Sequence, residues 1–217
     1  GVQTCALPIF ALQSGGEYDP VIADGGKTIA LLAAAGEPPT LQGTGGNPGL
    51  RVEGMGTVVY VEGLEISLSA GNAAGLQVTG ATAWVDRSRI VQNTGGGIVA
   101  ESGAVLTLRN SFVALNGGQF VDTRGITAIG SSLDVVYTTV AANDGTGSSG
   151  PISMSCDAAS SGSVRNSIIA ADTDTIACDN VSFSFSVVDT ADLAGLDNDV
   201  LSFDPAWFPS IGMSDFH

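Results

Sequence analysis

Three segments of the chain share one pattern of apolar and polar residues. They run from Ala83 to Asn93, from Leu106 to Asn116 and from Leu133 to Asn143, and each ends in Asn. Within each segment apolar positions recur at every second residue, which is the period of a β-strand that buries one face. No stretch of comparable length repeats at helical spacing. The pattern therefore predicts an all-β chain built from one recurring unit.

Aligning these segments produces columns of similar residues, and more distant segments join the same columns. The first apolar column contains Val61, Val85, Leu108, Val135, Val164 and Phe183. The second contains Ile66, Ile90, Val113, Val140, Ile169 and Val188. Members of the first column are 24, 23, 27, 29 and 19 residues apart. A variable period in the range of about 20–50 residues is typical of a solenoid whose coils carry loops of different lengths.

The spacing also distinguishes between two ways of connecting the strands. Hairpins would bring neighbouring strands together every 8–12 residues or so and would reverse their direction. Here equivalent residues recur two or three strands later, as expected when the chain returns to the same place in each coil. We therefore predict a parallel β-helix of about six to eight coils, with equivalent strands stacked about 4.8 Å apart.

Polar residues occupy two further columns. Ser88, Ser111, Thr138, Ser167 and Ser186 share the inward parity of the apolar columns, so we expect small hydroxyl groups facing inward at a bend and bonding to the backbone. Asn93, Asn116, Asn143 and Asp172 end their segments. Two interpretations of this terminal column are open. Asn tolerates the left-handed conformation that sharp turns need, and stacked Asn side chains can form a hydrogen-bonded ladder.

Composition and charge exclude several classes of function. The formal net charge is −15, which opposes nucleic acids and anionic bilayers. No apolar run reaches the roughly 20 residues of a membrane-spanning helix, so no membrane insertion is expected. The only histidine of the 217 residues is His217, the last one, so we expect neither a Ser-His-Asp triad nor a histidine zinc site within this sequence. Acidic residues crowd the last third, where Asp192, Asp197 and Asp199 are candidate calcium ligands, the alternative being a solvated loop.

The first nine residues stand apart from the rest of the chain. Residues 1–9, GVQTCALPI, match the translation of a short-read sequencing adapter, and we exclude them from the fold prediction. This exclusion also removes Cys5 from the cysteine count. We expect residues 10–217 to form a single parallel β-helix domain that is truncated at both ends.

Several short motifs carry a resemblance to a known family. They are Gly16-Glu17-Tyr18, the repeated Asn-Ser pairs at Asn110-Ser111 and Asn166-Ser167, the coil-ending Asn residues, and the stretches 203–208 and 215–217. From residue 15 onward the chain resembles secreted bacterial proteins with right-handed parallel β-helix repeats, of the pectin-lyase-like fold. The resemblance implies a right-handed coil and an extracellular or bacterial cell-surface location. This fold hosts lyases, hydrolases, epimerases and adhesins, so activity must be argued from a site.

The outward positions beside the first apolar column are the candidate site. Tyr60 and Trp84 would lie on adjacent coils and stack on sugar rings, with Asp86, Arg109 and Asp134 beside them. These residues predict a carbohydrate-contacting, non-catalytic module, adhesin-like or structural, without a cofactor. The alternative is a polysaccharide lyase or glycoside hydrolase. In lyases of this fold acidic residues hold calcium and an Arg or Lys removes the proton, and Asp86, Arg109 and Asp134 match those residue types.

A structural interpretation of the same residues is equally open at this stage. Asp86 and Arg109 would then form a surface ion pair between adjacent coils, worth roughly 0–1 kcal/mol, and Trp84 would lie under a loop.

Two cysteines remain once the first nine residues are set aside. Cys156 and Cys178 are 22 residues apart, close to the length of one coil, so they would lie on adjacent layers. Two cysteines in a chain expected to be secreted favour pairing. We therefore predict a disulfide between Cys156 and Cys178.

Overall fold

The computed structural model describes residues 7–117, 124–143, 152–170, 176–188 and 197–200. The described residues contain strands and no helix, and the strands form three parallel sheets. The chain is therefore all-β, as its alternating pattern predicts, and forms a right-handed parallel β-helix.

From β1 to β23 each sheet takes every third strand of the chain, and β24 joins the sheet of β23. Sheet A contains β1 (Ile9–Leu12), β4 (Thr28–Ala33), β7 (Val58–Glu62), β10 (Thr82–Asp86), β13 (Val105–Arg109), β16 (Ser132–Val136), β19 (Ser161–Arg165) and β22 (Val181–Ser184). Sheet B contains β2 (Glu17–Tyr18), β5 (Thr40–Gln42), β8 (Glu65–Ser67), β11 (Arg89–Val91), β14 (Phe112–Ala114), β17 (Thr139–Ala141), β20 (Ile168–Ala170), β23 (Val187–Val188) and β24 (Asp199–Val200). Sheet C contains β3 (Val21–Ala23), β6 (Leu50–Glu53), β9 (Leu76–Thr79), β12 (Ile98–Glu101), β15 (Arg124–Ile129), β18 (Ile152–Cys156) and β21 (Ile176–Ala177).

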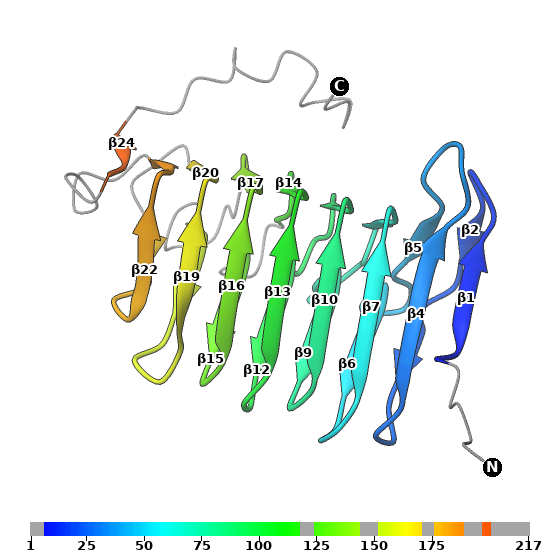
Figure 1. The fold of residues 1–217 in the computed structure, drawn as a ribbon. Coiled ribbons are helices and arrows are strands. Elements are labelled where there is room, and N and C mark those ends of the chain that lie inside the picture. The colour runs from blue at the N-terminus through cyan, green and yellow to red at the C-terminus, as the bar shows by residue number, and fades with distance from the viewer. Residues whose placement is uncertain (1–6, 118–123, 144–151, 171–175, 189–196, 201–217) are drawn as a thin grey trace.

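One coil consists of one strand from each sheet, followed in the order A, B, C. In Figure 1 the strands of sheet A stand side by side from β1, in blue, to β22, in orange. Strand β10 pairs in parallel with β7 on one side and β13 on the other, and the same pattern holds along the whole sheet. The chain therefore advances by one strand spacing, about 4.8 Å, with each coil.

The predicted apolar columns form the core. In sheet A the pairing register joins Val61 to Val85, Leu108, Val135, Val164 and Phe183 in turn, and all six side chains are buried. In sheet B it joins Ile66 to Ile90, Val113, Val140, Ile169 and Val188, all fully buried. Each aliphatic group thus packs on its equivalents above and below. Both predicted columns are confirmed.

Each eleven-residue segment of the sequence pattern covers two strands and the corner between them. Ala83 to Asn93 includes most of β10 and all of β11, separated by Arg87 and Ser88. At the corner Ser88 is buried and its hydroxyl group donates to the carbonyl oxygen of Asp86 at 2.8 Å. Its Oγ in turn accepts the N–H of Leu64 from the preceding coil. The expectation of inward hydroxyl groups bonded to the backbone at a bend is confirmed.

The hydroxyl column continues along most of this corner. Ser88 donates its N–H to Ser111 Oγ, Thr138 to Ser167 Oγ, and Ser167 to Ser186 Oγ. The hydroxyl column does not include Leu64, because no backbone N–H of the preceding coil needs an acceptor there. Pro39 occupies the equivalent place in the coil before Leu64, and because proline has no N–H, Leu64 can lack a hydroxyl without leaving a donor unpaired.

The corner between sheets B and C contains the Asn column, which is a hydrogen-bonded ladder. Asn93 Nδ2 donates to Asn116 Oδ1 at 2.9 Å, and Asn116 Nδ2 donates to Asn143 Oδ1 at 2.9 Å. The backbone N–H of Asn93 and of Asn116 donates to the same oxygens. All three residues are buried. Asp172, the fourth predicted member, lies outside the described residues.

The alternative interpretation, that these Asn residues adopt the left-handed turn themselves, is wrong. The positive φ angles belong to the residues just before them: Gln92 at 58°, Leu115 at 57° and Ala142 at 50°. A left-handed residue there turns the chain so that the next side chain points inward. The Asn amide then meets the backbone groups of the corner, which explains why a polar residue is buried at this place.

The predicted disulfide is confirmed. Cys156 in β18 and Cys178 after β21 are bonded, with their Cα atoms 4.6 Å apart. The bond joins adjacent coils at the sheet C side. The spacing of about one coil therefore identified the pair correctly.

The first described residues extend sheet A. The side chains of Leu7 and Ile9 are exposed, and the backbone of Ile9 pairs with Ala30 as the first residue of β1. The origin of residues 1–9 stays a hypothesis from the sequence.

Replacing Val135 with Asp tests the stacked core. Val135 is fully buried between Leu108 and Val164. An unpaired carboxylate there should lower the free energy of unfolding by several kcal/mol, measured by urea denaturation. Val105→Asp, at an exposed position of the neighbouring strand β13, is the control and should change it little. Equal effects of the two variants would contradict the register.

Replacing Asn116 with Ala tests the ladder. The change removes the acceptor of Asn93 and the donor to Ile90 O and Asn143 Oδ1. Leaving these buried groups unpaired should destabilise the protein by at least about 2 kcal/mol, seen as a lower urea midpoint. Asn72→Ala, at an exposed position, is the matched control. A midpoint for Asn116→Ala within error of that control would mean that the ladder contributes nothing.

Candidate functional site

The outer face of sheet A carries two columns of side chains that alternate with the buried one. The first contains Tyr60, Trp84, Thr107, Asp134 and Ser163. The second contains Glu62, Asp86, Arg109, Val136 and Arg165. All residues of the predicted site lie in these two columns. The strands β7, β10, β13 and β16 hold them about 4.8 Å apart from coil to coil.

Two aromatic side chains are stacked on this face. Tyr60 on β7 and Trp84 on β10 have ring centroids 6.2 Å apart and ring planes inclined by 26°. Tyr60 is 38% exposed and Trp84 is 42% exposed, so Trp84 does not lie under a loop. Because the two residues are register partners, the stacking follows directly from the pairing of their strands. The pair presents a partly open aromatic surface to solvent.

Asp86 is held by its own coil and by the next one. Asn110 Nδ2 donates to Asp86 Oδ1 at 2.8 Å, and Arg87 Nε lies 3.6 Å from Asp86 Oδ2. Arg87 also forms an ion pair with Glu62. Within the described residues no ion pair joins Asp86 to Arg109, although the two are register partners. The surface ion pair considered as an alternative is thus absent, and Arg87 takes the role expected of Arg109.

Asp134 is paired with Arg165 across one coil. Arg165 Nη2 donates to Asp134 Oδ1 at 2.8 Å, and Ser163 Oγ donates to the same oxygen at 3.0 Å. Partial burial raises the pKa of Asp134, but the hydrogen bonds from Arg165 and Ser163 and the positive charges of Arg165 and Arg109 outweigh it and hold the pKa below its usual value. Asp134 is therefore a stable carboxylate. A general acid would instead need a raised pKa.

Arg109 differs from the other cations of this face. Arg87 and Arg165 both form ion pairs, whereas Arg109 forms none within the described part of the chain. Its side chain is exposed. A guanidinium group offers five donors in a fixed plane. Arg109 thus leaves charged donors available to a ligand on a protein whose net charge is −15.

Two shallow depressions meet at Trp84 and Arg109. The aromatic depression, of about 180 Å3, is lined by residues that include Tyr60, Trp84, Asp86, Thr107 and Arg109. The polar depression, of about 330 Å3, is lined by Trp84, Thr107, Arg109, Asp134, Val136, Tyr137, Arg165 and Asn166. Because they share Trp84, Thr107 and Arg109, the two depressions adjoin at these residues. The predicted residues therefore lie on a single surface.

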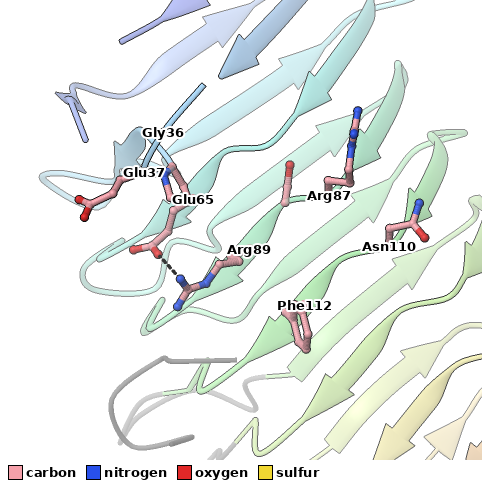
Figure 2. A pocket seen from close by; sticks show the side chains of 9 residues that line it. Gly36, Glu37, Glu65, Arg87, Arg89, Asn110 and Phe112 are labelled. Carbon is pink, nitrogen blue, oxygen red and sulfur yellow. Dashed lines mark ion pairs between the residues drawn. The ribbon is translucent and has the colours of Figure 1, made fainter. Parts of the chain in front are cut away.

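A larger depression of about 630 Å3 lies at the corner between sheets A and B (Figure 2). Arg89 and Glu65 line it and form an ion pair, with Arg89 Nη1 3.7 Å from Glu65 Oε2, and Phe112 lies nearby. Both of the cations that line it are already paired within the protein: Arg89 with Glu65, and Arg87 with Glu62 and Asp86. We therefore place the candidate site on sheet A despite the smaller volume there.

The predicted calcium ligands do not form a described site. Asp192 lies outside the described residues, while Asp197 and Asp199 are exposed. Among the residues that the structure describes, no three His, Cys, Asp or Glu side chains are grouped closely enough to hold a metal ion. The calcium site stays a prediction.

Sequence reasoning missed several residues of this surface. Tyr137, Arg165 and Asn166 line the polar depression, and Arg87 and Asn110 anchor Asp86. One signal would have found four of the five: Arg87, Asn110, Tyr137 and Asn166 each stand directly before a member of the hydroxyl column. The corner turns there, which directs their side chains outward.

Comparison with known proteins identifies no relative. No protein-family model matches the chain, and neither a curated protein nor a solved structure is significantly similar to it. Within the described residues there is no helix long and apolar enough to cross a membrane.

Proposed function

We propose that the outer face of sheet A is a carbohydrate-binding surface of a secreted or cell-surface protein, and that the module is non-catalytic. The observation that carries this proposal is the stacked, partly exposed pair Tyr60 and Trp84 beside Arg109, a cation without an ion pair among the described residues. The confirmed β-helix supplies a rigid support for it. The adhesin-like or structural role and the bacterial, pectin-lyase-like origin rest on the resemblance described above.

The chemistry of the surface suits a sugar chain. Aromatic rings bury the apolar C–H face of a pyranose, while Arg and carboxylate groups bond its hydroxyl or carboxylate substituents. Together the two depressions follow the axis of the helix, the aromatic one over strands β4 to β13 and the polar one over β10 to β19. A linear polysaccharide can follow that direction, with Trp84 under one ring and Arg109 beside the next.

The polar groups favour binding over hydrolysis. Hydrolysis by paired carboxylates needs one acid with a raised pKa. Asp134 has a lowered pKa and is bonded to Arg165, and Asp86 is bonded to Asn110 and Arg87. Asp134 is therefore not poised to donate a proton, and the carboxylate of Asp86 is already engaged by two donors of the protein.

A polysaccharide lyase is the second candidate, and Arg109 is the observation that favours it. A free Arg beside a sugar carboxylate could remove the α-proton in a β-elimination. Such an enzyme would release unsaturated oligosaccharides, which absorb in the ultraviolet. The binding proposal expects no such product from polysaccharides incubated with the protein. Release of product by the wild-type protein and its loss in Arg109→Ala would replace the binding function with a lyase function.

Location and partners follow from the same features. The disulfide between Cys156 and Cys178 fits an oxidising compartment, and the net charge of −15 opposes nucleic acid. The proposed partner is a polysaccharide or a cell-surface glycan.

Trp84→Ala tests the binding function. Removing the ring should weaken binding to a glycan identified on an array by about tenfold or more, because a stacking contact and its buried area are lost. The melting temperature should stay unchanged, since the ring is largely outside the core. Ile129→Ala, an exposed position on sheet C, is the control and should bind normally. Unchanged binding with a loss of about 3–5 kcal/mol in stability would instead make Trp84 a core residue.

A further inference from the structure

One column of residues, exposed except for the half-buried Gly63, follows the corner between sheets A and B. It contains Gly63, Arg87, Asn110, Tyr137, Asn166 and Phe185, all with positive φ angles. Every member before Phe185 donates its N–H to a carbonyl oxygen of the next coil, as Tyr137 does to Arg165 O and Asn166 to Ser184 O. The column therefore continues from coil to coil in register. Glycine adopts this left-handed conformation without strain, whereas larger residues do not.

Structural contacts explain Arg87 and Asn110 in this column, because both side chains bond Asp86. They do not explain Tyr137. Its φ angle is 52°, its side chain is 58% exposed, and within the described residues its ring makes no hydrogen bond or ring contact. A bulky residue held in a strained conformation and facing solvent contributes little to folding. The left-handed conformation belongs to the whole column, so what sets Tyr137 apart is an exposed ring that also lines the polar depression.

Tyr137 and Trp84 line the polar depression from coils that are two apart. Both line that depression, together with Arg109 and Asp134. Trp84 and Asp134 belong to one column two coils apart, and Tyr137 follows Asp134 by three residues. The Cα atoms of Trp84 and Tyr137 are therefore roughly 14 Å apart, because they differ by two strand spacings across the sheet and by three residues along the chain. This distance is longer than a single sugar ring.

We infer that Tyr137 is a second stacking position of the carbohydrate surface, and that the site takes an internal stretch of polysaccharide several sugars long. The inference rests on the proposed function. The chain would lie on Tyr60 and Trp84, pass Arg109, and reach the corner at Tyr137. Recognition by two separated aromatic positions makes affinity depend on ligand length. A short oligosaccharide can contact only one of the two positions at a time.

The unusual backbone at Tyr137 gives the test a useful variant. Tyr137→Gly removes the ring and also relieves the left-handed strain, so the protein should fold at least as well as the wild type. Phe185→Gly is the matched control. Phe185 is a 64% exposed aromatic residue in the same column with a φ angle of 51°, and it does not line the polar depression. Tyr137→Phe keeps the ring and should keep the binding.

The experiment is calorimetric titration of the full chain with oligosaccharides from two to eight units long. The probes are three series of (1→4)-linked glucose, mannose and galacturonic acid. For the series that binds, affinity should rise steeply once the ligand spans both positions. Tyr137→Gly should remove that rise, weakening the long ligands by about tenfold and leaving the short ones unchanged. Trp84→Ala should weaken short and long ligands alike.

Two results separate failure of this inference from failure of the proposed function. If Trp84→Ala weakens binding but Tyr137→Gly does not, or if Phe185→Gly weakens the long ligands equally, the second stacking position is wrong and the surface still binds carbohydrate. If the wild-type protein binds none of the three series, the carbohydrate function is contradicted, and the role of Tyr137 with it.

Discussion

The constraint on which this structure depends is that every buried position must continue in register from one coil to the next. Within the strands parallel pairing meets this requirement directly, because it stacks Val85 on Val61 and Leu108 on Val85. The corners are harder, since a turn interrupts the ladder of backbone hydrogen bonds and buries polar groups. The chain solves this with two side-chain ladders. Ser and Thr hydroxyl groups complete the corner between sheets A and B, and Asn amides complete the corner between sheets B and C. Without them buried N–H groups would be unpaired, at about 1–3 kcal/mol each.

The residue types at positions that face the core are therefore restricted, whereas those at positions that face outward can vary. Along the inward column the residues are all aliphatic or aromatic. Directly beside it, the outward column changes from Tyr60 and Trp84 to Thr107, Asp134 and Ser163. The fold does not require these outward residues, so their identities are where a function can be found. The stacked rings and the unpaired Arg109 lie together because register alone brings them to one face.

Much of the fold could be predicted because parallel register makes similar residues recur in the sequence at the length of one coil. Val135 and Val140 were placed correctly by matching columns, and Cys156 and Cys178 by a separation close to one coil. The sequence pattern does not indicate strand β5, since Thr40–Gln42 is short and lies in a segment without a clear alternating pattern. The sequence also could not show that Gln92 and Leu115, and not the coil-ending Asn residues that follow them, adopt the left-handed conformation. Any residue type can be forced into that conformation when the surrounding coils determine it.

The candidate site was only partly predictable for a different reason. Parity and register identify which residues face outward together, and this placed Tyr60, Trp84, Asp86, Arg109 and Asp134 on one surface. Which charged side chains pair with each other depends on the length of the side chains and on the geometry of the corners. The sequence pattern does not encode either feature. Asp86 bonds Asn110 and Arg87, both located at the corner, and Asp134 bonds Arg165 from the next coil. Arg109 is left unpaired as a consequence, and the contribution of Tyr137 appears only when the corner is seen.

The most direct test of the central claim, that buried side-chain ladders lock the corners in register, is amide hydrogen exchange. The N–H groups of Asn93 and Asn116 donate to the Asn side chain of the next coil, and that of Ser88 donates to Ser111 Oγ. Although these amides belong to turns, they should exchange as slowly as the strand amides of Val85 and Leu108. Exchange as fast as that of an exposed turn such as Gly45 would contradict the account, because the corners would then open independently of the core.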